Sequence, residues 1–169
     1  DNAPVITGFT VNNNGSLDAS QAGGAFLSAT LTFTDDVTGF NNANADFKNA
    51  DGNNISLSFS SGNISGSRLA GKINSFKQLS ATNDKAGTYE LYRIVITDKS
   101  NNSFEAEKHT NPSPGSTNEQ EQAAYDAFIA DLGGVPSFVV TTPPVTPDTE
   151  APQISGFKTI GDRLRVTIS

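Results

Sequence analysis

Short segments in which apolar and polar residues alternate recur along the chain and constrain its fold most strongly. In the clearest of these segments, serine and threonine alternate with the apolar residues Leu27, Ala29, Leu31 and Phe33. A period of two is typical of a β-strand with one buried face. The same signal predicts strands near residues 5–11, 26–34, 43–49, 54–60, 67–77, 87–97, 103–108 and 136–142, separated by turn-forming residues at 12–15, 35–39, 51–52, 61–62 and 85–87. This order predicts an all-β, antiparallel two-sheet sandwich.

One segment has a helical period instead. Its apolar residues fall at i, i+3, i+4 and i+7, and they are Tyr125, Phe128, Ile129 and Leu132. Ser116 and Glu119 have the spacing of a capping box, and residues 133–134 (GG) supply a stop. The pattern predicts a single helix near residues 117–132, inside an insertion near 112–134. We expect this insertion to pack its apolar stripe over one end of the sandwich.

An internal repeat divides the chain. Residues 2–9 (NAPVITGF) recur as residues 150–157 (EAPQISGF), with Ala-Pro, isoleucine and Gly-Phe at the same spacing and an offset of 148 positions. After the second copy, apolar residues again alternate with polar ones, at Leu164, Val166 and Ile168. Three prolines between the copies favour a stiff, extended connector. The sequence therefore predicts a module at 1–142, a Pro-rich linker at 143–148, and the truncated start of a second module at 149–169.

Composition narrows the class of partner and the compartment. The 169 residues include no cysteine, so a disulfide framework, a thiol nucleophile and a cysteine-ligated zinc site are excluded. Secreted eukaryotic domains often carry disulfides, so their absence favours a bacterial surface protein. A net charge of −7 repels phosphate backbones and anionic membranes. No stretch reaches the ~20 apolar residues of a membrane span. We therefore expect neither a nucleic-acid partner nor membrane insertion.

Four segments carry a family resemblance. They are residues 1–4 (DNAP), residues 34–39 (TDDVTG), and residues 86–91 (AGTYEL) leading to 97–102 (TDKSNN). Together they resemble the bacterial immunoglobulin-like, cadherin-like tandem repeats of large surface proteins and adhesins. Residues 98–102 depart from the usual DNAGN, which removes a side-chain ligand at position 99. The resemblance implies an immunoglobulin-like sandwich, interrupted here by the inserted helix.

The resemblance also implies a function. Such a module is a non-enzymatic structural or adhesive repeat of a long extracellular, secreted protein, and it acts as a spacer at the cell surface. Its expected partners are the neighbouring repeats of the same chain, with a cell-surface glycan or protein as a further partner. The alternative is a glycan- or protein-binding accessory module of a secreted hydrolase.

Acidic and amide residues lie in the segments that a sandwich of this kind gathers at one end. They are Asp1, Asp35, Asp36, Asp98 and Asn101, with Asn102 beside them. Calcium takes six to eight oxygen ligands from such groups, so one interpretation is a Ca²⁺ site that stiffens the joint between modules. The other is that these residues only form turns, because aspartate and asparagine dominate turns for local hydrogen-bonding reasons.

The remaining candidates for chemistry are few. No nucleophile elbow or paired-histidine metal motif is present, so no catalytic residue is expected. The single histidine, His109, could serve as a general base or a metal ligand, but the sequence offers it no partner, so the favoured prediction is a solvated loop. A flat aromatic platform for glycans would have to use Tyr89, Tyr92 and Tyr125. All three fall in apolar periodicity, which favours core packing.

Overall fold

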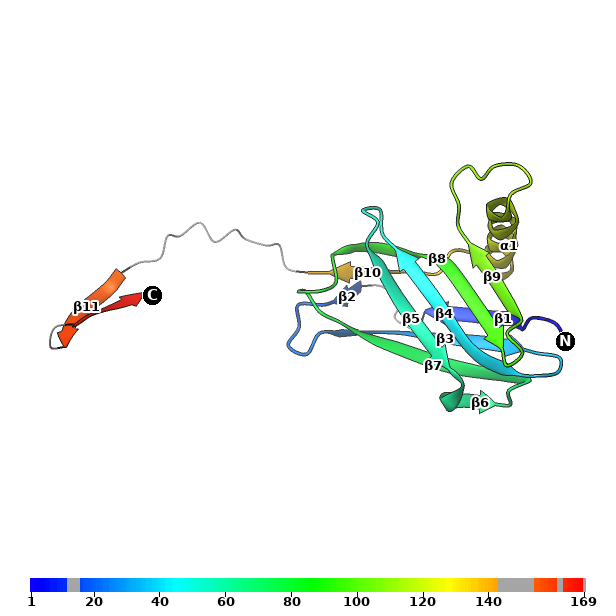
Figure 1. The fold of residues 1–169 in the computed structure, drawn as a ribbon, viewed down its shortest axis with the longest axis horizontal. Coiled ribbons are helices and arrows are strands. Elements are labelled where there is room, and N and C mark those ends of the chain that lie inside the picture. The colour runs from blue at the N-terminus through cyan, green and yellow to red at the C-terminus, as the bar shows by residue number, and fades with distance from the viewer. Residues whose placement is uncertain (12–15, 143–153, 161–162, 169) are drawn as a thin grey trace.

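The computed structural model describes residues 1–11, 16–142, 154–160 and 163–168, with side chains described only up to residue 142. The chain is mostly β, with two large sheets and one α-helix in the described residues (Figure 1). The predicted all-β class with a single helix is confirmed. The strands up to residue 142 are β1 Val5–Val11, β2 Ser16–Asp18, β3 Ala25–Thr34, β4 Phe40–Lys48, β5 Asn54–Ser60, β6 Ile64–Gly66, β7 Ala70–Leu79, β8 Gly87–Asp98, β9 Ser103–Glu107 and β10 Ser137–Thr141.

The first sheet has the strand order β1-β3-β7-β6. Strands β3 and β7 pair over their whole length, from Ala25 opposite Leu79 to Thr34 opposite Ala70. In β3 the residues from Leu27 to Phe33 alternate between buried and partly exposed, as the sequence pattern predicts. Strand β1 pairs with β3 and carries a register shift between Ile6 and Gly8.

The second sheet has the order β2-β10-β8-β4-β5. Strand β8 is long enough to pair with two strands along one edge. Its residues 87–90 pair with β10, and its residues 93–97 pair with β9. The described pairs are antiparallel except β2 with β10, which is parallel. This parallel pair corrects the predicted all-antiparallel sandwich. Nothing in the sequence indicates it, because β2 has only three residues and no periodic pattern of its own.

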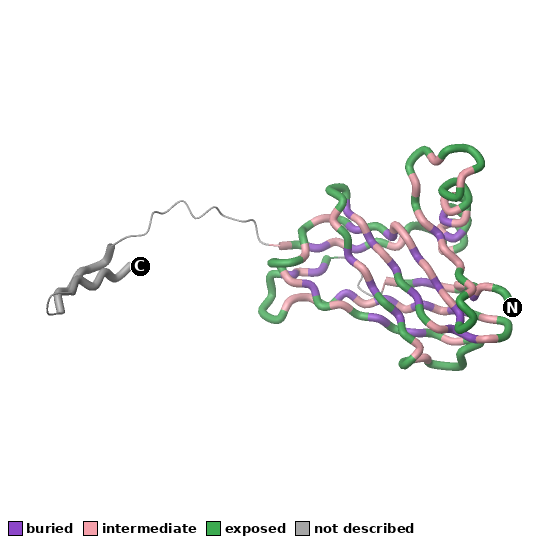
Figure 2. Tube along the Cα trace, viewed as in Figure 1, coloured by how far each residue is buried: buried purple, intermediate pink, exposed green. Residues whose placement is uncertain are grey.

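The two sheets pack face to face around one core. Phe9 of β1 lies 6.2 Å from Phe47 and 6.1 Å from Phe59 between ring centroids, so the first sheet contacts β4 and β5 of the second. Phe33 of β3 stacks on Phe40 at 4.6 Å. Figure 2 shows the buried positions recurring along the strands of both sheets. Burial of these rings, together with the aliphatic residues of both inner faces, stabilises the module.

The helix α1, Thr117–Leu132, has the predicted bounds. Ser116 Oγ accepts a hydrogen bond from the Glu119 main-chain N–H at 3.2 Å, and Gly133 ends the helix at φ 75°. Tyr125 and Phe128 are buried, and the Phe128 ring lies 6.4 Å from Phe104 of β9. The helix packs on β9, an edge strand of its sheet, and residues of α1, β9 and β1 line a common pocket, so α1 covers the side of the sandwich between β9 and β1. The predicted position over one end is wrong.

Strands β11, Ile154–Ile160, and β12, Arg163–Ile168, form a separate antiparallel pair. Their register shifts between Ile154 and Gly156. The predicted turn at 12–15, the predicted linker at 143–148 and the first residues of the predicted second module lie outside the described residues. Among the described residues, no helix has the length and apolar character needed to cross a membrane.

Candidate functional site

The chain enters the module at the end where the β3–β4 and β8–β9 loops also lie. Hydrogen bonds join the three segments there. Asn102 Nδ2 donates to Asp1 at 3.0 Å and to Asp98 at 2.8 Å. Thr38 Oγ1 lies 2.8 Å from Asp98 Oδ2 and 3.3 Å from Asp1 Oδ2. We call this group of loops and carboxylates the acidic end.

Asp35 shapes the β3–β4 loop. Its Oδ1 accepts hydrogen bonds from the main-chain N–H of Val37 at 3.1 Å and of Gly39 at 2.8 Å. Its Oδ2 is buried and, within the part of the chain that the structure describes, receives no hydrogen bond. A buried carboxylate oxygen without a donor is costly, so this atom is suited to a cation or to a water molecule.

Asp36 is held by Asn2. Its Oδ2 accepts a hydrogen bond from Asn2 Nδ2 at 2.7 Å, and both of its oxygens lie 3.3 Å from the Asn2 main-chain N. These bonds, first from the main chain and then from the side chain of Asn2, lower the pKa of the Asp36 carboxyl below its ordinary value. Asp36 is therefore charged at neutral pH.

Asp98 is fully buried and satisfied by the protein. Its Oδ1 accepts from the main-chain N–H of Ser100 and Asn102, each at 2.8 Å, and its Oδ2 accepts from Thr38 and Asn102. Burial alone would raise the pKa of Asp98, but hydrogen bonds from Asn102, Thr38 and Ser100 outweigh it, and the pKa is lowered. Asp98 thus folds the β8–β9 turn.

The five predicted ligands do not have equal positions. Asp1, Asp35 and Asp36 each offer a carboxylate oxygen, and these atoms lie within 4.8 Å of one another. Asp98 joins them through Thr38 and Asn102. Asn101 adopts a left-handed φ of 67°, and its main-chain N lies 3.3 Å from the Asp98 carbonyl oxygen. The sequence did not single out Thr38. A threonine in a loop is common, and nothing in its position indicates that its hydroxyl reaches Asp98 and Asp1.

The acidic end therefore offers three converging carboxylates beside a pocket of about 240 Å³. The pocket is lined by Asn2, Ala3, Val5, Thr34, Asp35 and Asp36. Oxygen donors of this kind suit a hard divalent cation.

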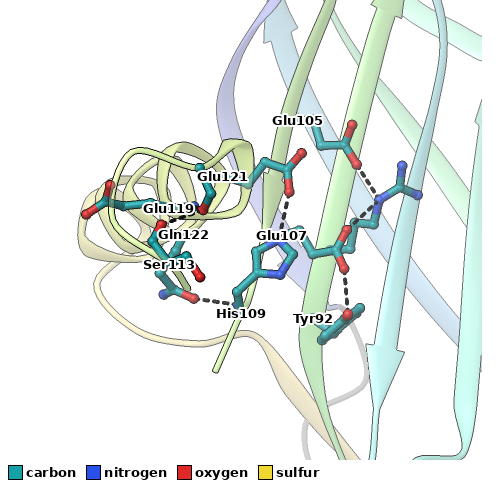
Figure 3. Close-up of polar contacts among 10 residues, drawn as sticks. Tyr92, Glu105, Glu107, His109, Ser113, Glu119, Glu121 and Gln122 are labelled. Carbon is teal, nitrogen blue, oxygen red and sulfur yellow. Dashed lines mark hydrogen bonds and ion pairs between the residues drawn. The ribbon is translucent and has the colours of Figure 1, made fainter. Parts of the chain in front are cut away.

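A second polar cluster joins the sheet to the helix (Figure 3). His109, two residues after the end of β9, lies with its Nε2 2.7 Å from Glu121 Oε2 of α1. Its main-chain N–H donates to Gln122 Oε1 at 2.5 Å. The prediction of a solvated, unpartnered histidine is wrong, because the folded helix returns to the end of β9 and partly buries the ring.

The three tyrosines do not form an exposed platform. Tyr89 and Tyr125 are buried, and Tyr92 is partly buried with Lys48 Nζ 3.4 Å from its ring centroid. The predicted core packing is confirmed for Tyr89 and Tyr125. Exposed rings occur instead at Phe26 and Phe76, which are 55% and 72% exposed. They lie on the neighbouring strands β3 and β7.

Scans of the chain against protein-family models, curated proteins and solved structures gave no match.

Proposed function

We propose that residues 1–142 are one immunoglobulin-like repeat of a long extracellular bacterial surface protein, and that the repeat is a structural or adhesive spacer without enzymatic activity. The observation that carries this proposal is a backbone feature found twice. Strand β1 shifts register against β3 between Ile6 and Gly8, and β11 shifts against β12 between Ile154 and Gly156. The two bulges lie 148 positions apart, the offset of the sequence repeat. Bulges are specific local features, so the match supports a second copy of the same module.

The strand order supports the immunoglobulin-like assignment. The order β1-β3-β7-β6 corresponds to strands A, B, E and D, and the order β10-β8-β4 corresponds to G, F and C. In this assignment the last strand is split, because β9 and β10 pair with successive parts of β8. The helix α1 is then an insertion within strand G.

The position of the acidic end supports a role in the joint between repeats. In a tandem array, the preceding module would meet this one where Asp1 and Asn2 enter the sandwich. We propose that a calcium ion binds here, with Asp1, Asp35 and Asp36 as the principal ligands. Its bond to Asp35 would satisfy the buried Oδ2 atom and hold the entering segment against the β3–β4 loop. The ion would thereby stiffen the joint.

Thermal unfolding tests the calcium site. Millimolar Ca²⁺, compared with a chelator, is expected to raise the melting temperature by several degrees, because a ligand at a hundredfold excess over its Kd stabilises the fold by about 2.7 kcal/mol. Asp35→Asn and Asp36→Asn should each reduce this shift. Asp51→Asn is the matched control, since Asp51 is an exposed turn aspartate between β4 and β5, at the opposite end of β4.

Two results would contradict the calcium site. One is the absence of any shift, and the other is an equal shift in the Asp35 and Asp51 variants. Na⁺ at the same ionic strength distinguishes coordination from screening.

A second candidate is the accessory module of a secreted hydrolase that binds a glycan. The exposed rings of Phe26 and Phe76 favour it. Phe26 pairs with Gln78 and Phe76 with Ser28, so the two rings are diagonal neighbours on one face of the sheet. Sugars stack on exposed aromatic rings flanked by polar groups. This candidate uses the outer face of β3 and β7 and leaves the acidic end without a role, so the repeat remains our first proposal.

A further inference from the structure

Glu107, His109 and Glu121 bring three metal-ligating side chains together at the junction of the sheet and the helix. Glu107 is the last residue of β9, and Glu121 belongs to the second turn of α1. One ligand atom from each of the three lies within 4.8 Å of the others. Their side chains are 20%, 17% and 23% exposed, respectively. The group is thus mostly buried, and a part of each side chain is open to solvent.

Neighbouring residues hold each of these side chains. Glu107 Oε1 accepts a hydrogen bond from the Tyr92 hydroxyl at 2.5 Å, and Glu107 Oε2 lies 3.3 Å from Arg93 Nε. Gln122 accepts from the His109 main chain, which places the ring against the helix (Figure 3). In metal sites, hydrogen bonds from neighbouring groups to the ligand residues hold those residues in position.

The charges around the group favour an additional cation. Arg93 faces three carboxylates, with Glu105 at 2.5 Å, Glu107 at 3.3 Å and Asp46 at 3.5 Å. The guanidinium thus serves three carboxylates, and the fourth carboxylate of the region, Glu121, lies beside His109 instead. The adjacent cation Lys108 pairs with a different carboxylate, that of Glu90, at 3.4 Å.

We propose that Glu107, His109 and Glu121 bind a divalent transition metal ion, for which Zn²⁺ is the representative, and that the ion fastens α1 to the edge of the sheet. An imidazole nitrogen with two carboxylates suits zinc and its neighbours, whereas Ca²⁺ and Mg²⁺ take oxygen ligands. Water would fill the remaining position. Zinc–ligand bonds of about 2.0–2.1 Å separate two tetrahedral ligands by about 3.3 Å, so His109 and Glu121 need to move apart by only about 0.6 Å from their present 2.7 Å.

The composition makes the test specific. The chain has one histidine and no cysteine, so a nitrogen-ligated metal has one side chain to bind. Titration calorimetry of the full, tag-free chain with ZnCl₂ should give one ion per chain and a higher melting temperature. The imidazole resonances of His109 should shift in the same titration. Ca²⁺ at equal concentration should not displace the zinc.

Substitutions distinguish zinc binding at this site from non-specific binding to other acidic side chains. Glu121→Gln and His109→Gln should each weaken Zn²⁺ binding by at least about tenfold. Asp131→Asn is the matched control, because it removes an exposed carboxylate from the same helix outside the group, and it should bind as the unmodified chain does. Unchanged affinity in either site variant would overturn the proposal. So would unmoved His109 resonances in the unmodified chain, a result that does not depend on how any variant folds.

Discussion

At the scale of single residues, two aspartates of the acidic end have contrasting surroundings. Asp98 is fully buried, and each of its oxygens accepts two hydrogen bonds from the protein. Asp35 uses one oxygen for its own loop and keeps the other buried without a donor in the described residues. Both are turn aspartates in sequence. The number of donors that each oxygen meets distinguishes the turn former from the candidate ligand.

Tyr125 links the inserted helix to the core by one hydrogen bond. Its hydroxyl donates to the Leu91 main-chain oxygen at 2.7 Å in a buried setting. Tyr125→Phe leaves that oxygen without its donor, so we expect the free energy of unfolding to fall by about 1–2 kcal/mol at neutral pH. Urea denaturation followed by circular dichroism measures this difference. An unchanged midpoint and slope would contradict it.

The same residue predicts a pH dependence. Burial, with smaller contributions from Glu90 and Asp126, raises the pKa of Tyr125 from 10.0 to about 12. Because this pKa is raised in the folded state, the stabilisation that the protonated Tyr125 hydroxyl provides is complete below pH 10. It is lost as the pH rises toward 12. The stability difference between the unmodified chain and Tyr125→Phe should therefore narrow over this range. A constant difference from pH 9 to pH 12 would show that the hydroxyl is not buried in this way.

At the scale of elements, close contacts of the main chain limit which residues the strand connections can contain. Gly24, directly before β3, has φ +73°, and a Cβ built there would lie 2.0 Å from the Leu79 carbonyl oxygen of β7. Its neighbour Gly23 also has a positive φ, of +94°, but nothing lies within 4 Å of a Cβ there. Substituting alanine at Gly23 therefore tests the cost of the left-handed backbone alone, whereas the same substitution at Gly24 adds a steric overlap with β7.

Gly24→Ala is expected to destabilise the module far more than Gly23→Ala. The left-handed conformation costs an alanine about 1–2 kcal/mol at either site. At Gly24 the methyl group must also displace the main chain of β7, which we expect to bring the total to roughly 3 kcal/mol or more. Thermal unfolding of both variants provides the comparison. Equal losses would mean that β3 and β7 separate at this end without cost.

At the scale of the whole molecule, the buried core of the described side chains extends from Phe9 in β1 to Val140 in β10. Strand β10 pairs with both β2 and β8, so it completes the second sheet. We therefore expect a chain ending at residue 142 to melt at the same temperature as the 169-residue chain. A fall of several degrees would show that residues 143–169 stabilise the first module, and the proposed boundary would then be wrong.

Much of the fold could be predicted from local patterns. The predicted strands at 5–11 and 54–60 match β1 and β5, and the predicted helix matches α1. These elements carry their own signals, which are a period of two, a period of 3.6 and caps. Strands β2 and β6 were missed, because each has only three residues. Three residues are too few to establish a period, and such strands form because a longer neighbour offers an edge.

The candidate sites, like the fold, were predicted from the sequence only in part. Sequence patterns alone predict the positions of the main elements, the repeat offset of 148 and the acidic residues of two turns. The folded chain was needed to show that Asn102 contacts Asp1 and that His109 contacts Glu121. It was also needed to show that both oxygens of Asp98 accept hydrogen bonds, whereas Oδ2 of Asp35 accepts none from the described residues. Turns and periods depend on neighbours a few positions away. A binding site depends on side chains from different elements, and their distances are set by sheet pairing and core packing.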